Sequence, residues 1–179
     1  GAGVEAHERH TMHEVDELLA AQRLVQPAAG HVRAREHRVE HIERRAALMT
    51  QVGDDKPLAK RLALAADQFV VRRERDTTAI VAGYPWLPDH ARDTMLALPG
   101  LLLVNGRFRE AKSILRYHAR ALERGLLPDK LPEGTERAEY GSVDATLWFF
   151  VAVFRYLQYT GDFDFVKTEL RIPMLEMVR

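Results

Sequence analysis

After residue 54, apolar side chains recur at helical spacing, and this pattern constrains the fold more than any other feature of the sequence. The first such helix is expected to begin near Pro57, because proline suits the first turn of a helix. Its apolar side chains follow one another at intervals of four, three and four residues: Leu58, Leu62, Ala65 and Phe69. No stretch alternates between apolar and polar residues for long enough to predict a strand. The sequence therefore predicts an all-α fold.

Four further helices are expected, and capping or turn residues mark their ends. Their approximate ranges are 94–104, ending at Asn105 and Gly106; 108–122, ended by Gly125; 143–159, capped by Ser142 and ended by Gly161; and a last helix from its cap Asp162 to Arg179, kinked at Pro173. The loop 126–141 should lie on the surface at one end of these helices. Residues 1–53 are polar and favour helix, so they are expected to form a helical linker.

Composition excludes several classes of function. The chain has 179 residues, of which 46% are hydrophobic, which is enough for one compact domain with a core. Because 26 Lys and Arg balance 26 Asp and Glu, a nucleic-acid partner is not expected. The absence of cysteine fits a cytoplasmic location and leaves no thiolate metal site. The longest apolar run, 145–154, is too short for a membrane span, which needs about 20 residues.

Eight histidines raise the question of a metal site. His37 and His41 have the i, i+4 spacing of a helical zinc pair, but no third ligand can be predicted, and a closed zinc site needs about four ligands. Solvated side chains on a charged helix are therefore the preferred interpretation, and no metal is expected. His118 lies on an apolar stripe and is expected to be a satisfied core residue.

Two polar and aromatic segments interrupt the apolar pattern. In the first, 83–95, the residues with binding chemistry are Trp86, Asp89, His90, Arg92 and Asp93. Sugar C–H faces stack on aromatic rings, and sugar hydroxyls need charged, bidentate partners such as Asp and Arg. The structural alternative is that Asp93 caps a helix, Arg92 pairs with it, and Trp86 anchors the core.

The second segment, 139–150, repeats this mixture of acidic and aromatic residues. Asp144 lies one or two residues inside the start of a helix, where the helix dipole stabilises a carboxylate. The same position can direct an acid into a cavity lined by Tyr140 and Trp148. We expect apolar surroundings to raise the pKa of Asp144, as a general acid requires.

Six short motifs follow one another in order: Ala82–Trp86, Arg92–Met95, Leu98–Leu101, Gly106–Phe108, Gly125–Pro128 and Val143–Phe149. In sequence and spacing they resemble the glucosidase domain of glycogen debranching enzymes, the amylo-α-1,6-glucosidase family. The resemblance extends from about Leu58 to Asp162. It implies an (α/α)₆ toroid of helical hairpins that hydrolyses α-1,6-linked glucose with inversion, using two carboxylic acids and no metal or organic cofactor.

The resemblance also implies roles for individual residues. By position, Asp144 matches the general acid, and Arg92 and Asp93 match a pair that holds the hydroxyls of the terminal glucose. Side chains that would shape the sugar pocket are Trp86, Asp89, Tyr140 and Trp148. Lys130 falls where the family has a basic residue in a loop that faces the cavity. His90 and Ala91 depart from the aromatic residue and glycine that are usual in the family, and His90 is expected to touch sugar.

The resemblance covers only part of the family's barrel. Residues 54–179 are expected to form its first part and 1–53 the preceding linker, so the chain is interpreted as a fragment that lacks the general base, a Glu of the later half. Among the loop acids, Glu133 and Glu136 are expected to be solvated, whereas Glu139 could contact substrate. The expected partners are an α-glucan or oligosaccharide and either the rest of the barrel or a second copy, held by exposed apolar helices.

Two alternative functions stay open at this point. One is a hydrolase of the same fold that acts on another glycoside, as glucoamylases and trehalases do. The other is a carbohydrate-binding module without catalysis.

Overall fold

The computed structural model describes residues 42–50, 52, 56–73, 77–83, 89–130 and 138–179. The chain separates into two compact units, Gly1–Glu43 and Arg44–Arg179. The named elements lie in the second unit and are predominantly helical, as the sequence predicts. Of the residues expected to form a linker, 42–50 are helical, and His37 and His41 lie outside the described residues.

Helix α3, Pro57–Asp67, begins with proline in its first turn as predicted, but it buries a different face. Leu58 and Leu62 leave 67% and 62% of their surface exposed. The buried residues are Ala63, Ala66 and Asp67. Helix α3 contacts the segment η3. Leu58 and Leu62 of the predicted apolar stripe are therefore not part of the core.

A short antiparallel hairpin follows α3 and was not predicted. Strands β1, Val70–Arg72, and β2, Thr78–Ile80, pair with Val70 opposite Ile80. The strands have three residues each, which is too short for a period-two pattern to stand out. Their buried side chains, Val70 and Ile80, join the main core, and β2 contacts helices α4 and α5.

Helix α4, Ala91–Leu98, continues into η3, a π-helical segment over Pro99–Leu103. The amide of Val104 donates to the carbonyl of Pro99 at 3.0 Å, a bond to the fifth residue back that marks the wider turn. The side-chain amide of Asn105 donates to the carbonyl of Leu101 at 3.0 Å, and Gly106 has a φ of 66°. The predicted helix stop at Asn105 and Gly106 is thereby confirmed.

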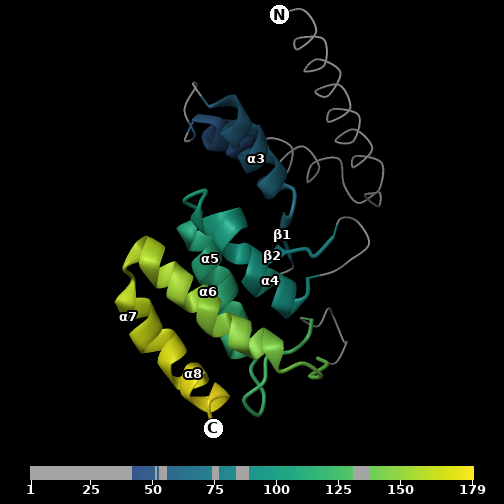
Figure 1. The fold of residues 1–179 in the computed structure, drawn as a ribbon, viewed down its shortest axis with the longest axis vertical. Coiled ribbons are helices and arrows are strands. Elements are labelled where there is room, and N and C mark those ends of the chain that lie inside the picture. The colour runs from purple at the N-terminus through teal and green to yellow at the C-terminus, as the bar shows by residue number, and fades with distance from the viewer. Residues whose placement is uncertain (1–41, 51, 53–55, 74–76, 84–88, 131–137) are drawn as a thin grey trace, which may run out of the picture. The chain divides into compact units, whose positions relative to one another are not determined.

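Helices α5, Phe108–Arg120, and α6, Asp144–Thr160, enclose the core together with α4 (Figure 1). Both α4 and α5 pack against α6. Their fully buried side chains include Met95, Leu98, Ile114, Leu115, Phe149 and Tyr156. Helix α6 ends at Gly161, which has a φ of 64°, as the sequence predicts. The core side chains of α4 and α6 therefore begin just over one turn after the starts of these helices, with Met95 and Phe149.

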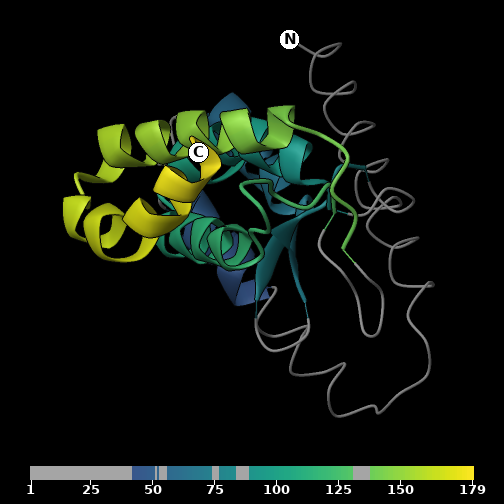
Figure 2. The ribbon, with the colours of Figure 1, turned by 90° about the horizontal axis from the view of Figure 1, so that it is seen from below.

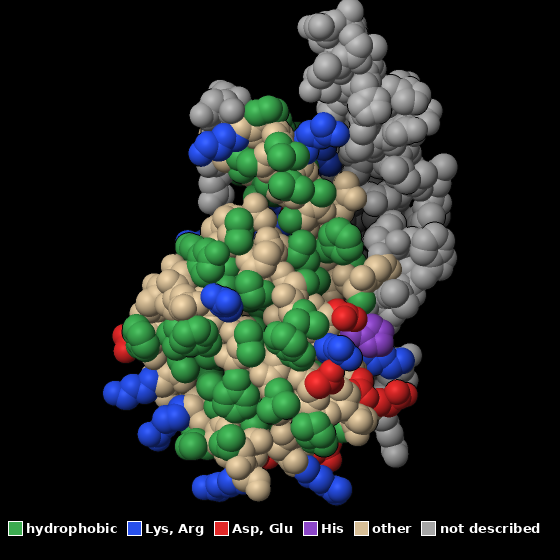
Figure 3. Space-filling view, in the orientation of Figure 1, with side chains coloured by type: hydrophobic (Ala, Val, Ile, Leu, Met, Phe, Trp, Pro, Cys, Tyr) green, Lys and Arg blue, Asp and Glu red, His purple; other side chains and the backbone are tan. Residues whose placement is uncertain are grey.

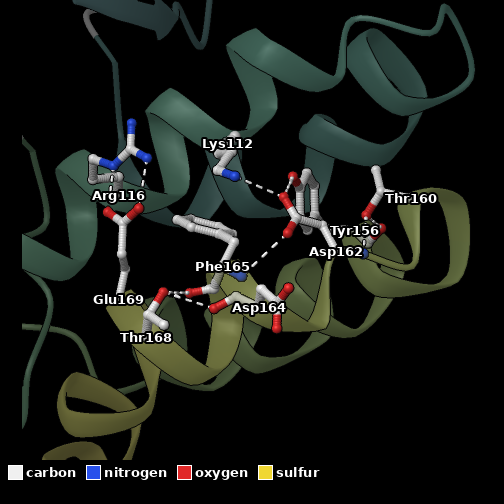
Figure 4. Close-up of polar contacts among 9 residues, drawn as sticks. All are labelled: Lys112, Arg116, Tyr156, Thr160, Asp162, Asp164, Phe165, Thr168 and Glu169. Carbon is white, nitrogen blue, oxygen red and sulfur yellow. Dashed lines mark hydrogen bonds and ion pairs between the residues drawn. The ribbon is translucent and has the colours of Figure 1, made fainter.

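The chain then folds back along α5 through α7, Phe163–Phe165, η4, Val166–Leu170, and α8, Arg171–Met177 (Figure 2). The carboxylate of Asp162 accepts a hydrogen bond from the amide of Phe165 at 3.1 Å, which confirms the predicted cap. Asp162 also accepts hydrogen bonds from Lys112 and Tyr156, and Arg116 binds Glu169 with two hydrogen bonds (Figure 4). The helix widens at η4, just before Pro173, whose ring cannot fit a regular turn.

One face of this unit is rich in exposed apolar side chains (Figure 3). On α6 and just before it, the exposed large hydrophobic residues are Val143, Leu147, Val151, Phe154 and Tyr159. None of the helices that the structure describes combines the length and the hydropathy needed to cross a bilayer.

Candidate active site

Three segments that are distant in the sequence meet at one end of the helices. They are the start of α4, the loop 127–130, and the segment 138–143 that leads into α6. Lys130 forms antiparallel β-bridges with His90 on one side and Glu139 on the other. The backbone therefore places three predicted substrate-binding residues next to one another.

Asp129 is the centre of this junction. Its carbonyl accepts a hydrogen bond from the amide of Ala91 at 2.8 Å, and its amide donates to the carbonyl of Glu139 at 2.7 Å. Its carboxylate oxygen Oδ2 accepts from the amide of Gly141 at 2.8 Å. No motif in the sequence marks Asp129 as a site residue, although the side chain of an aspartate after proline in a loop often binds nearby backbone.

The two polar segments meet directly through an ion pair. Nη1 of Arg92, in the first turn of α4, lies 3.0 Å from Oδ2 of Asp144, the first residue of α6. The structural alternative for the first segment is therefore wrong in two respects: Arg92 pairs with Asp144, and His90 rather than Asp93 occupies the N-cap position of α4. Asp93 is exposed in the first turn of this helix. Both side chains of the ion pair keep contact with solvent, at 60% exposed for Arg92 and 39% for Asp144.

The pKa of Asp144 is lowered, which corrects the expectation that it is raised. The main cause is the hydroxyl of Ser142, which donates a hydrogen bond to Oδ1 of Asp144. Partial burial opposes the shift, whereas Arg92 and the backbone amides at the start of α6 add to it. Ser142 therefore does not cap α6 as predicted: Val143 holds the N-cap position, and the Ser142 hydroxyl is directed to the carboxylate.

Asp89 lies at the buried edge of this region. Its Oδ2 is 2.7 Å from Nη1 of Arg73, and only 5% of its side chain is exposed. The hydroxyl of Thr94, also buried, lies 3.4 Å from the carbonyl of Ile80 and connects α4 to β2. The ion pair gives Asp89 a structural role in joining the hairpin to α4, and its predicted contact with sugar stays a prediction.

The aromatic residues of the predicted pocket have different surroundings. The hydroxyl of Tyr140 donates to the carbonyl of Ala121 at 3.0 Å, and its pKa is raised, first by burial and then by Glu123. Trp148 lies one turn after Asp144 on α6 and packs partly buried against the core. Trp86 lies outside the described residues. Tyr140 thus anchors the second segment to the end of α5.

His118 is a core residue, as predicted, but its hydrogen bonding is only half satisfied. Its Nδ1 is 2.9 Å from the carbonyl of Ile114, whereas its buried Nε2 has no partner among the described residues. Burial lowers the pKa of His118 to about 4, so the ring is neutral at pH 7. In the part of the chain that the structure describes, no group of three or more potential ligands is placed to hold a metal ion.

These features define a predominantly helical domain in which an arginine and a carboxylate meet at the starts of two helices. The family model for amylo-alpha-1,6-glucosidase matches residues 64–178, and the chain belongs to this family. The resemblance drawn from the short motifs is thereby confirmed. The glycogen debranching enzyme of Saccharomyces cerevisiae is 28% identical over 123 residues, which cover 62% of this chain and 8% of the yeast protein. The chain thus spans a small part of that relative, and no solved structure matches it significantly.

Proposed function

We propose that this chain is the first part of an (α/α)₆ glycoside hydrolase that removes α-1,6-linked glucose from an α-glucan with inversion. The observation that carries the proposal is the ion pair of Arg92 with Asp144, which joins the two segments that sequence chemistry assigns to sugar binding. Membership of the amylo-alpha-1,6-glucosidase family supports the substrate class.

In this proposal, Asp144 gives a proton to the glycosidic oxygen as the bond to glucose breaks. An inverting enzyme needs a second carboxylate on the opposite side of the sugar, about 6.5–9.5 Å away, to activate water. We assign that base to a Glu in a later part of the parent polypeptide. Arg92 and Asp93 bind the hydroxyls of the terminal glucose, because charged groups can replace the water that these hydroxyls lose.

The lowered pKa of Asp144 sets a condition on this mechanism. A general acid must keep its proton near the working pH, whereas the hydrogen bond from Ser142 and, after it, the charge of Arg92 favour the ionised form of Asp144. A glucose ring that covers Asp144 would exclude water from the carboxylate, and sugar hydroxyls bound to Arg92 would draw its guanidinium away from Asp144. Each change raises the pKa of a carboxyl group, so substrate binding itself would prepare the acid.

A second candidate function is carbohydrate binding without catalysis. The observation that favours it is the same lowered pKa, because an ionised Asp144 beside Arg92 is a good acceptor for sugar hydroxyls but a poor proton donor. The two functions differ in what the carboxylate must do. Binding needs only its charge and oxygens, whereas hydrolysis needs its proton.

The test is release of free glucose from a phosphorylase-limit dextrin by the parent polypeptide that contains this sequence. Asp144→Asn should abolish release, while Asp164→Asn, which changes an exposed acid in the first turn of α7, should leave it intact. Sugar binding is measured in parallel by calorimetry. Binding without release in the unmodified polypeptide would favour the binding module, and full release by Asp144→Asn would remove Asp144 from the acid role.

A further inference from the structure

We propose that Asp129 is a positioning residue for Asp144: its carboxylate holds the segment that presents Ser142 to Asp144, and its backbone ties the same loop to the start of α4, which carries Arg92. The proposal rests on the function proposed above for Arg92 and Asp144. Neither the motifs nor the predicted pocket assigned a role to Asp129.

Asp129 forms hydrogen bonds to the residue directly before Arg92 and to the residue directly before Ser142. Its carbonyl accepts from the amide of Ala91, the residue before Arg92, at 2.8 Å. Its carboxylate accepts from the amide of Gly141, the residue before Ser142, at 2.8 Å. Ser142 in turn donates its hydroxyl hydrogen bond to Asp144. Asp129 is therefore bound to the start of α4 through its backbone and to the segment before Asp144 through its carboxylate.

The contact at Gly141 leaves little freedom. A Cβ added at Gly141 would lie 2.9 Å from Oδ2 of Asp129, closer than a carbon and an oxygen can approach. A side chain at this position would have to push the carboxylate aside and so weaken its hydrogen bond to the Gly141 amide. The absence of a side chain at Gly141 thus lets Asp129 hold this segment.

The other oxygen of the carboxylate indicates that stability alone does not explain Asp129. Its Oδ1 is buried and has no hydrogen-bond partner among the described residues. An unpaired buried oxygen costs free energy of desolvation, so an apolar residue would be preferred if position 129 served only folding. The contact that the structure shows in return is the hydrogen bond that Oδ2 accepts from the amide of Gly141.

The experiment measures the pKa of Asp144 by carbon-13 NMR titration of its carboxyl group in the 179-residue chain. Asp129→Ala and Asp129→Asn remove the same charge, but the amide oxygen of asparagine can still accept from Gly141. Asp144 should therefore titrate at a higher pH in Asp129→Ala than in Asp129→Asn. Only Asp129→Ala loses the hydrogen bond to Gly141 that keeps the Ser142 hydroxyl directed to Asp144. The charged and hydrogen-bonding side chains that act on Asp144, Arg92 from α4 and Ser142, are unchanged in both variants.

A second pair of variants tests the route of the effect. In a Ser142→Ala background the two Asp129 variants should give the same pKa for Asp144, because the hydroxyl through which Asp129 acts is gone. Equal pKa values in the presence of Ser142, or a difference that persists without it, would overturn the proposal. Because no substrate is present, the outcome does not depend on whether the parent polypeptide releases glucose. If Asp129→Ala does not fold, Gly141→Ala replaces it, and a pKa of Asp144 unchanged from the original chain then overturns the proposal.

Discussion

The acidic residues of this chain have different roles because their partners differ. Asp89 is buried against Arg73 and holds the β-hairpin to α4. Asp144 lies at the start of α6, where Ser142 and Arg92 favour its ionised form while solvent still reaches it. At the scale of single residues, hydrogen-bond donors and burial therefore decide whether a carboxylate serves the fold or stays available to a ligand.

Burial of His118 makes the stability of the domain depend on pH. Its pKa is about 4 in the folded state against 6.5 for an ordinary histidine, so the unfolded chain binds a proton that the folded chain excludes. Stability should be complete above pH 6.5 and should fall as the pH drops from 6.5 toward 4, by about 2 kcal/mol between pH 7 and pH 5. The measurement is the free energy of unfolding in urea at these two pH values.

His118→Leu removes this titration and is the matched comparison. Its free energy of unfolding should change less than that of the original chain between pH 7 and pH 5, and the two curves should run parallel above pH 7. An equally steep fall in His118→Leu would assign the pH dependence to other groups.

Two glycines should respond to alanine in opposite directions. Gly141→Ala places a Cβ 2.9 Å from the carboxylate of Asp129 and should cost about 1 kcal/mol through the lost hydrogen bond. Gly100→Ala, in the helical segment η3, meets nothing within 4 Å and should stabilise the domain by about 0.5–1 kcal/mol. Both values come from urea unfolding, and a stabilising Gly141→Ala would contradict the contact on which the role of Asp129 depends.

At the scale of elements, a few buried ion pairs fix how the helices join. Asp67 ends α3, and its Oδ1 is 2.8 Å from Nη1 of Arg107 at the N-cap of α5. The same oxygen lies 3.0 Å from Nε of Arg44, in the helical residues 44–50. A second set of contacts, around Asp162 and Phe165, joins the ends of α5, α6 and α7 (Figure 4).

Asp67→Asn should destabilise the domain by about 3 kcal/mol. Among the described residues, Glu110 is then the remaining charged partner of the buried Arg107, and the loss of the buried Asp67 carboxylate leaves the positive charges of Arg107 and Arg44 less well compensated. Asp164→Asn removes an exposed acid and serves as the control, with a change of less than about 0.5 kcal/mol. Chemical denaturation of the original chain and of the two variants gives both changes in the free energy of unfolding. Equal midpoints for the two variants would contradict a buried role for Asp67.

Elements with local signals could be predicted, and those set by distant contacts could not. The stops at Gly106 and Gly161 and the cap at Asp162 depend on residues within one turn, so the sequence indicates them. The β-hairpin is too short for a pattern, and the exposed face of α3 depends on what the helix packs against.

In the candidate site, too, some features could be predicted from the sequence and others depend on distant contacts. Its residue types, above all Arg92 and Asp144, were predicted from sugar chemistry and from the family resemblance. The role of Asp129 could not be, because its partners Ala91 and Gly141 lie 38 residues before it and 12 residues after it. The direction of the pKa shift at Asp144 also depends on Arg92, which is distant in the sequence, and on a hydroxyl that sequence reasoning assigned to the backbone.

At the scale of the whole molecule, the exposed apolar surface of α6 predicts association. Leu147, Val151 and Phe154 recur at helical spacing and are all exposed, and contiguous apolar surface of this kind on soluble proteins marks a contact with another protein segment (Figure 3). The 179-residue chain by itself should therefore self-associate, which sedimentation velocity at increasing protein concentration would detect. Leu147→Lys should shift the distribution toward the monomer, whereas Gln158→Lys, which adds the same charge to another exposed position of α6, should not. A chain that stays monomeric at all concentrations and unfolds cooperatively would show that the apolar face of α6 is stable in contact with water. The expectation that further helices or a second copy cover this face would then be wrong.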